Sequence, residues 1–425
     1  MMTAFDILAI LMTVTAVLAW VNYRFVRLPT TIGLMVISLL FSLGLVAAGG
    51  LSFGVRELMV SLLGRVDFDD TLLHGMLGAM LFAGALHIDL NELAEERGMV
   101  AVLATAGVVI STAVVGGLSW LALGSLGQDV PVIYCLLFGA LISPTDPIAV
   151  GAILRKIGLP KNLLVAISGE SLFNDGVGVV VFLVLLEIAA GHQAVSGSNV
   201  LELLAVEGVG GVLYGAAVGY LAYRMLKSVD NYQVEILITL ALVTGGYALA
   251  YRLHVSGPLA MVVAGLMIGN HGRAFAMSEQ TRDRLDAFWE LVDEFLNALL
   301  FVLIGAEVLV LTFSAPALVA GLVAVPIVLA ARYVSVAVPA LALRPWRRIT
   351  AGTIGIMTWS GLRGGISVAL ALSLPAGPER DLLITMTYVV VVCSIVGQGL
   401  TISRAAARLA SGMGGPNPPG GGTPQ

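Results

Sequence analysis

Long apolar runs recur along the whole chain and constrain its fold more than any other feature. Of the 425 residues, 58% are hydrophobic and only 12% are charged, whereas about 25% of the residues in a soluble domain are charged. A helix that crosses a bilayer needs about 20 apolar residues, so the chain holds roughly thirteen membrane-spanning runs. They lie near residues 3–22, 29–48, 71–88, 98–124, 130–154, 162–190, 202–226, 233–251, 256–270, 290–311, 315–343, 350–374 and 381–403. The sequence therefore predicts an all-α polytopic membrane protein.

The basic residues predict how these runs are oriented. Most of the 22 Lys and Arg fall in alternate loops, for example at Arg155 and Lys156. Because cytoplasmic loops carry an excess of Lys and Arg, we expect the N-terminus outside an inner (plasma) membrane and the C-terminus in the cytoplasm. Residues 1–410 are expected to form the transmembrane domain, and the Gly- and Pro-rich residues 411–425 a disordered tail.

Two of the polar segments between the runs carry specific expectations. Residues 52–70 are more polar than their neighbours and are expected to hold a short surface helix. Residues 278–286 have alternating charges and are interpreted as a solvated loop before the tenth run. Gly211, Gly215 and Gly219 recur every four residues, a spacing typical of closely packed membrane helices.

The composition argues against several classes of partner. The net charge is −5 and no basic tract occurs, so we expect no nucleic acid partner. Cys135 and Cys393 both lie inside apolar runs, which argues against a disulfide framework and a thiolate metal site. We expect no resident cofactor, and the lipid bilayer as the surrounding medium.

The fifth run is interrupted by the polar segment Ser-Pro-Thr-Asp-Pro at residues 143–147. A carboxylate at membrane depth costs on the order of 2.5–3.5 kcal/mol on insertion scales. Pro144 breaks the helix and frees backbone carbonyls, and Pro147 disfavours helical geometry at Asp146. A proline kink turned toward a neighbouring helix would explain the prolines alone. Because Thr145 and Asp146 lie inside the break, we favour an ion or substrate site.

The sixth run carries the second polar segment, Gly-Glu-Ser-Leu-Phe-Asn-Asp-Gly at residues 169–176. Ser171, Asn174 and Asp175 share one face of a helix because they stand three and four residues apart. Glu170 lies at the edge of that face, four residues before Asn174. A hydroxyl, an amide oxygen and a carboxylate suit a hard cation. The alternative is a polar packing stripe, which two acids at mid-membrane make less attractive.

The twelfth run places Arg363 among three glycines in Trp-Ser-Gly-Leu-Arg-Gly-Gly-Ile-Ser at residues 359–367. A buried guanidinium needs an acidic partner, for which Glu170 and Asp175 are the candidates. The twelfth run comes seven runs after the fifth, and both are interrupted. Such a pair predicts inverted repeats with two interrupted helices that cross at the binding site.

The three polar segments together resemble the monovalent cation/proton antiporters of the NhaP/NHE type. The residues that carry the resemblance are 143–147, 169–176 and the Gly-Leu-Arg-Gly at 361–364. The resemblance implies thirteen helices, a homodimer, and a mobile core bundle that slides against a dimerisation bundle. It implies an electroneutral exchange of one cation for one proton, since Asn174 precedes Asp175 where other members have two aspartates.

The resemblance also implies roles for individual residues. The ion or proton site would consist of Asp175 and Asp146, which hold Na⁺, assisted by Asn174, Ser171 and the backbone of Thr145. Glu170 would pair with Arg363 as a structural ion pair. Some relatives carry an acid near Ala83, so a ligand from that helix is in doubt. His87 follows in the same run and is interpreted as a loop-end histidine, with pH sensing as the alternative.

We therefore expect a secondary antiporter, not an enzyme, that exchanges cytoplasmic Na⁺ for external H⁺. Li⁺ or K⁺ could replace Na⁺ because all three use the same oxygen ligands. An intramembrane aspartyl protease that uses Asp146 and Asp175 as a dyad is one alternative, although no Gly-x-Gly-Asp run occurs. A cation channel is the other alternative.

Overall fold

A computed structural model describes residues 4–47, 75–146, 148–190, 202–307, 309, 314–345 and 349–411, and helices account for nearly all of them. The first half of the described chain holds these α-helices: α1 (Ala4–Val21), α2 (Thr30–Ala47), α5 (Leu77–Leu86), α6 (Leu90–Val102), α7 (Val108–Ser125), α8 (Val132–Leu141), α9 (Ile148–Ile157) and α10 (Lys161–Ala189). The second half holds α12 (Gly210–Leu226), α13 (Tyr232–Arg252), α14 (Gly257–Met267), α15 (Arg273–Phe275), α16 (Glu279–Glu307), α17 (Ala315–Leu343), α18 (Ala351–Trp359), α19 (Gly365–Leu372), α20 (Pro378–Cys393) and α21 (Gly399–Ser411). Short π-helical turns adjoin several of them, at Asn22–Val26, Leu103–Gly107, Ala205–Val209, Ile268–Gly272 and Ser394–Gln398.

The helices follow the apolar runs closely, which confirms the predicted all-α membrane fold. Among the described residues, 7 helical segments are long and apolar enough to cross a membrane, and shorter apolar helices such as Leu77–Leu86 and Val132–Leu141 accompany them. The fifth run is divided into α8 and α9, and the twelfth into α18 and α19. Both interruptions were predicted from the sequence. The total of thirteen spans remains a prediction.

One expectation about a connecting segment is wrong. Residues 278–286 are not a loop, because α16 already begins at Glu279. Their charges lie on the outer face of a helix, while Leu285 and Trp289 are fully buried on the inner face. Alternating charges thus marked an amphipathic first turn rather than a break. The predicted surface helix in residues 52–70 and the predicted tail after Ser411 lie outside the described residues.

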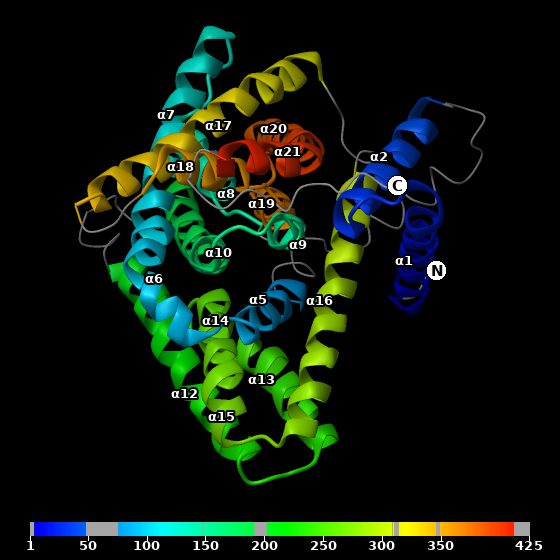
Figure 1. Ribbon diagram of the computed structural model, residues 1–425. Coiled ribbons are helices and arrows are strands. Elements are labelled where there is room, and N and C mark those ends of the chain that lie inside the picture. Colours follow the sequence, from blue (N-terminus) through cyan, green and yellow to red (C-terminus); the bar gives the residue numbers. More distant parts are fainter. Residues whose placement is uncertain are drawn as a thin grey trace, which may run out of the picture.

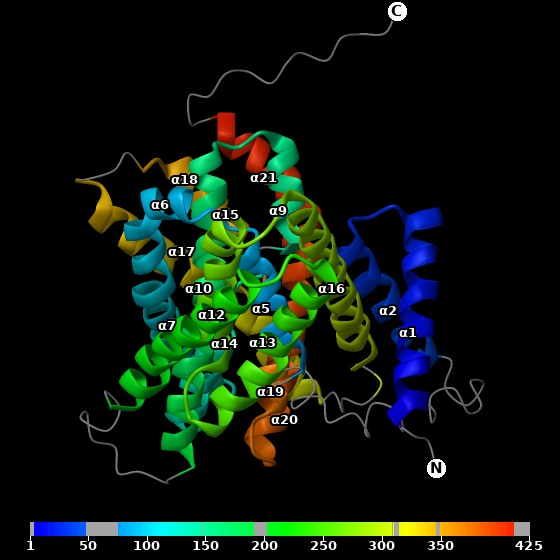
Figure 2. The same ribbon diagram turned by 90° about the horizontal axis from the view of Figure 1, so that it is seen from below.

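The described helices form two groups by their contacts. Helices α6 to α10 pack with one another and with α17 to α21, while α5 and α12 to α14 pack together with α16, which also contacts α1 and α2. In Figure 1 the first group lies mainly in the upper half and α12, α13 and α14 in the lower half. Figure 2 shows α1 and α2 side by side at one edge. The two groups meet where α10 contacts α14 and α5, and where α16 contacts α19.

Small residues bring α12 and α14 close together. A Cβ atom on Gly215 would lie 2.5 Å from the carbonyl oxygen of Ala260, and one on Gly211 would lie 2.8 Å from that of Ser256. Real side chains do not approach a backbone that closely, so glycine is required at both positions. The packing role predicted for these glycines is therefore confirmed.

Replacing Gly215 by valine should destabilise the protein. The added side chain would overlap the α14 backbone at Ala260, and overpacking of this kind costs about 1–3 kcal/mol. We expect a lower melting temperature for the detergent-purified protein. The matched control is Gly245→Val on α13, where an added Cβ meets no atom within 4 Å. Equal melting temperatures for the two variants would contradict the packing role.

Candidate ion-binding site

The two interrupted helices cross at their breaks. Helix α8 ends at Leu141 and α18 ends at Trp359, and each is followed by a short extended segment. The backbone N–H of Asp146 donates to the carbonyl oxygen of Leu362 over 2.8 Å, and these two residues form an antiparallel bridge. The crossing that the sequence predicted is thus made by a direct backbone contact between the two halves of the chain.

Arg363 satisfies the carbonyl groups that the first break leaves free. Its Nη1 atom donates to the carbonyl oxygens of Ser143, at 2.5 Å, and Pro144, at 3.0 Å. These carbonyls follow the C-terminal end of α8, which carries partial negative charge. A cation there compensates both the helix end and the lost helical hydrogen bonds. The guanidinium therefore joins one broken helix to the other.

Polar side chains of neighbouring helices hold each break. On the α8 side, the Ser143 hydroxyl lies 2.6 Å from the Gly139 carbonyl oxygen and 2.8 Å from the hydroxyl of Ser111, which belongs to α7. On the α18 side, the backbone N–H of Arg363 donates to the Ser394 hydroxyl over 3.0 Å.

The Ser394 hydroxyl in turn donates to Gln398, whose amide donates to the Trp359 carbonyl oxygen over 3.3 Å. Ser111, Ser394 and Gln398 were not among the site residues predicted from the sequence. Their polar side chains inside long apolar runs were the available signal.

Helix α10 brings its predicted polar face to the first break. The hydroxyls of Ser171 and Thr145 lie 3.0 Å apart. The Asn174 amide is bonded at both ends, because its oxygen accepts the Thr145 N–H at 3.2 Å and its nitrogen donates to the Thr145 hydroxyl at 2.8 Å. The same nitrogen donates to the Glu170 carboxylate over 2.8 Å. Asn174 thus orients both Thr145 and Glu170.

The two aspartates of the predicted site lie in this polar centre. Asp175 is 6% exposed and interacts electrostatically with Asp146, Glu170 and Arg363. The Asp146 carboxylate lies beside Gly364, where an added Cβ would come within 3.0 Å of its Oδ2 atom. Gly364 caps the N-terminus of α19, and the positive end of a helix favours a carboxylate. The structure therefore brings Asp146, Asp175, Ser171, Asn174 and Thr145 together.

The predicted pairing of Glu170 with Arg363 is wrong. Glu170 is bonded by Arg332 of α17, whose Nη1 and Nη2 atoms donate to its two carboxylate oxygens over 2.7 and 2.8 Å. Both side chains are buried, at 1% exposure for Glu170 and 6% for Arg332. Two parallel charge-assisted hydrogen bonds give this pair a strong and specific geometry. Arg363 is engaged instead by the carbonyls of the α8 break.

The helix that carries Ala83 and His87 lies beside the site. Ala83 is fully buried in α5, and a Cβ on the next residue, Gly84, would approach Leu172 of α10 at 3.8 Å. His87 is exposed at the end of α5, with its Nδ1 atom 3.5 Å from Arg273. Arg273 also forms an ion pair with Asp286 of α16. A pH-sensing role for His87 remains a prediction.

Comparisons with known proteins agree with this architecture. Residues 11–408 match the family model described as sodium/hydrogen exchanger, transmembrane. The Na⁺/H⁺ antiporter NhaP of Pseudomonas aeruginosa is 51% identical over 413 residues, which cover 96% of this chain and 97% of that protein. The Na⁺/H⁺ antiporter NhaH of Halobacillus aidingensis is 33% identical over 80% of this chain and 84% of its own length.

A solved structure shows the same fold. The sodium proton antiporter MjNhaP1 from Methanocaldococcus jannaschii at pH 8 matches with a TM-score of 0.76 at 18% identity, over 96% of this chain and 98% of that one. The chain thus belongs to the sodium/hydrogen exchanger family. Within this family the chain is an antiporter of the NhaP type, as the three polar motifs indicated. It is a multi-pass membrane transporter rather than an enzyme.

A double-mutant cycle should identify the partner of Glu170. Removing one member of a buried ion pair leaves the other without a partner and costs about 3–5 kcal/mol. We expect Glu170→Gln and Arg332→Gln each to lower the melting temperature strongly and their effects to be far from additive. Glu170→Gln combined with Arg363→Gln should be closer to additive. A larger coupling to Arg363 than to Arg332 in thermal unfolding would contradict the assignment.

Proposed function

We propose that the protein exchanges cytoplasmic Na⁺ for external H⁺ at one site, in which Asp175 binds either ion. The observation that carries the proposal is the burial of Asp175 on α10, whose Ser171 and Asn174 lie within hydrogen-bond distance of Thr145 at the crossing of two broken helices. Carboxylate and hydroxyl oxygens are suitable ligands for a hard monovalent cation. Li⁺ and K⁺ use the same ligands and are candidate substrates as well.

Competition at a single carboxylate couples the two fluxes. Asp175 with a proton bound and Asp175 with Na⁺ bound carry the same total charge, and the two states exclude each other. If only an occupied site crosses the membrane, each Na⁺ carried one way returns as one H⁺. The neutral side chain of Asn174 adds no second titrating group beside Asp175, which supports a stoichiometry of one to one.

The other charges of the centre have structural roles in this mechanism. Glu170 is bonded twice by Arg332, and that pairing keeps its carboxylate ionised through the cycle. Arg363 holds the backbone carbonyls of the first break. The Asp146 carboxylate lies beside Gly364 at the N-terminus of α19, and Asp146 is proposed as a cation ligand. Because Glu170 and Arg363 are held by these hydrogen bonds, Asp175 is proposed as the group that alternately binds Na⁺ and H⁺.

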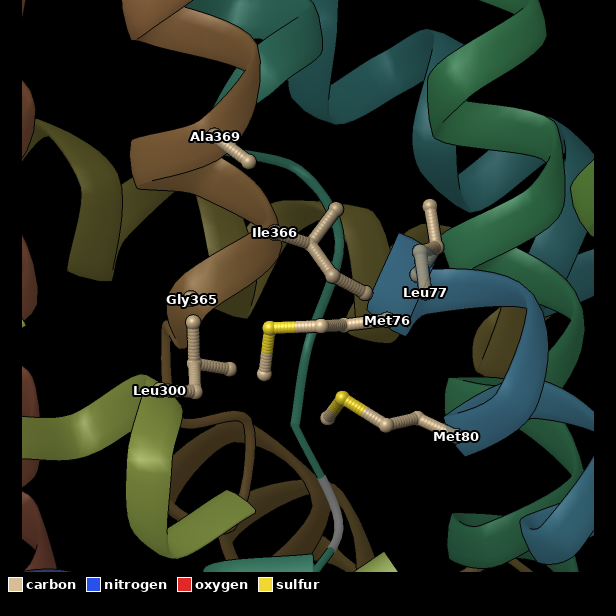
Figure 3. Close-up of a pocket in the computed structure, with 7 residues that line it drawn as sticks. All are labelled: Met76, Leu77, Met80, Leu300, Gly365, Ile366 and Ala369. Carbon is tan, nitrogen blue, oxygen red and sulfur yellow. The ribbon is translucent and has the colours of Figure 1, made fainter. Parts of the chain in front are cut away.

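An apolar cavity supports alternating access between the two groups of helices. It is lined by Met76, which immediately precedes α5, by Leu77 and Met80 of α5, by Leu300 of α16, and by Gly365, Ile366 and Ala369 of α19. Figure 3 shows the Met76 side chain reaching across it toward Leu300 and Gly365. Since no polar side chain lines this cavity, it is a poor route for an ion.

We propose that the α6–α10 and α17–α21 helices are the mobile core, and that the remaining described helices form the dimerisation bundle of a homodimer.

The proposed orientation follows from the basic residues. Arg155 and Lys156 lie at the end of α9, and Arg224 lies in the last turn of α12. Placing these loops in the cytoplasm sets the N-terminus outside an inner (plasma) membrane. A cytoplasmic C-terminus follows from the thirteen predicted spans.

Replacing Asp175 by asparagine should abolish exchange and leave the fold intact. The amide keeps the shape and the hydrogen-bonding capacity of the carboxyl group but loses both the exchangeable proton and the charge. The measurement is the collapse of a pH gradient in proteoliposomes on addition of Na⁺, Li⁺ or K⁺. Asp146→Asn should be inactive as well, through loss of a ligand. Exchange by the Asp175→Asn protein would refute the proposal, whereas the exposed Asp129→Asn serves as the active control.

The exchange should be insensitive to membrane potential. One Na⁺ for one H⁺ moves no net charge, although about 100 mV is worth about 2.3 kcal/mol per unit charge. We expect the Na⁺ gradient that exactly balances a given pH gradient to be the same at 0 and about 100 mV. A shift of that balance point would mean more than one proton per cation. Ion flow without proton exchange would instead indicate a channel.

A further inference from the structure

Helix α16 carries a polar pair that the proposed site does not use. Asp293 and Asn297 stand four residues apart in the middle of a helix of 29 residues, on one face. The Asn297 amide nitrogen donates to the backbone carbonyl oxygen of Asp293 at 2.9 Å and to its carboxylate at 3.1 Å. A half-buried carboxylate in an apolar run needs a reason, as Asp146 and Asp175 did.

The face of α16 with this pair is turned toward the crossing. Leu300 lies on the same face, three residues after Asn297. It packs against Gly365 of α19: a Cβ atom added to Gly365 would lie 2.3 Å from the Cδ2 atom of Leu300. Gly365 follows Gly364, against which the Asp146 carboxylate lies. The Asp293 carboxylate is also within the range of charge repulsion from Asp146. The pair therefore lies beside the proposed ion site, on the opposing group of helices.

The Asn297 side chain has an unused acceptor at this place. The residue is 1% exposed, and within the described residues its Oδ1 atom is buried with no hydrogen-bond partner. Buried amide oxygens are rarely left in that state, and each such case calls for an explanation such as a water or an ion. Together with the Asp293 carboxylate, this oxygen offers two of the ligands that a hard cation prefers.

We propose that Asp293 and Asn297 form a second cation-binding position, which Na⁺ occupies on its way to and from Asp175 and Asp146. The position lies in the middle of α16, on the N-terminal side of Leu300: Asn297 precedes Leu300 by three residues and Asp293 by seven, which is about two helical turns. Leu300 borders the apolar cavity of Figure 3. Neither Asp293 nor Asn297 lines that cavity. The inference rests on the proposed function, because it deepens the description of the same transport path.

Direct binding tests the proposal in protein that cannot use the main site. The full chain carrying both Asp146→Asn and Asp175→Asn should still be stabilised against heat by NaCl relative to choline chloride, at higher Na⁺ concentrations than the unmodified protein needs. Adding Asp293→Asn should remove that stabilisation, and adding Glu294→Gln should not. Glu294 is the matched control because it is an exposed acid at the next position. No Na⁺ effect in the double variant, or an effect that Asp293→Asn leaves unchanged, would overturn the proposal.

Transport by otherwise unmodified protein gives a second test. Asp293→Asn should raise the apparent KM for Na⁺ about tenfold, equivalent to 1.4 kcal/mol, and leave the maximal rate nearly unchanged. Asn297→Ala should raise KM in the same direction, and it replaces the Asp293 variant if that protein folds poorly. Glu294→Gln should behave as the unmodified protein does. Equal KM changes for Asp293→Asn and Glu294→Gln that both vanish at high choline chloride would show a general charge effect and refute a binding position.

The two proposals fail in different experiments. If Asp175→Asn still exchanges ions, the proposed function is wrong whatever the α16 variants show. If Asp175→Asn is inactive while the Asp293 and Asn297 variants bind and transport normally, the function stands and only the second position is wrong.

Discussion

Buried charge and broken backbone must be compensated within the protein, and the centre of this structure depends on that requirement. Proline at residue 144 and the glycines around Arg363 interrupt two helices at membrane depth, where unsatisfied carbonyl groups cost several kcal/mol each. The Arg363 guanidinium bonds the carbonyls of one break, and its backbone N–H is bonded by Ser394 beside the other. The Asp146–Leu362 contact closes the crossing. Without these bonds neither half-helix could end where it does.

The same requirement separates the paired charges from the Asp175 carboxylate, for which exchange is proposed. Glu170 and Arg332 satisfy each other in a buried bidentate pair, and Asn174 ties that pair to Thr145. The scaffold therefore holds the Ser171 and Thr145 hydroxyls in one arrangement, and Asp175 follows Ser171 by four residues on the same helix. A rigid frame around one carboxylate is what the proposed exchange at a single site requires, because the frame must tolerate either Na⁺ or H⁺ there.

Contacts between the two groups of helices give the site a polar and an apolar side. Methionine and leucine side chains meet α19 at the cavity, while Asp293 and Asn297 form a polar pair on α16, with Asp293 within the range of charge repulsion from Asp146. The two breaks are also supported in parallel ways, by Ser111 of α7 on one side and by Ser394 after α20 on the other. These parallel supports are consistent with the repeated architecture inferred from the two interrupted runs.

The sequence by itself determined the helical runs, the two interruptions, the polar residues of the site and the family, because apolar run length, proline and buried acids act locally along the chain. It did not determine which buried arginine pairs with Glu170, since Arg332 and Arg363 both lie in apolar runs and distance along the chain does not report distance in space. The alternating charges of residues 278–286 also predicted a loop, whereas burial of Leu285 and Trp289 favours a helix there. Only the tertiary structure decided these points, because they depend on which faces of distant helices meet. The Arg363 guanidinium, for example, already donates its hydrogen bonds to the carbonyl oxygens of Ser143 and Pro144.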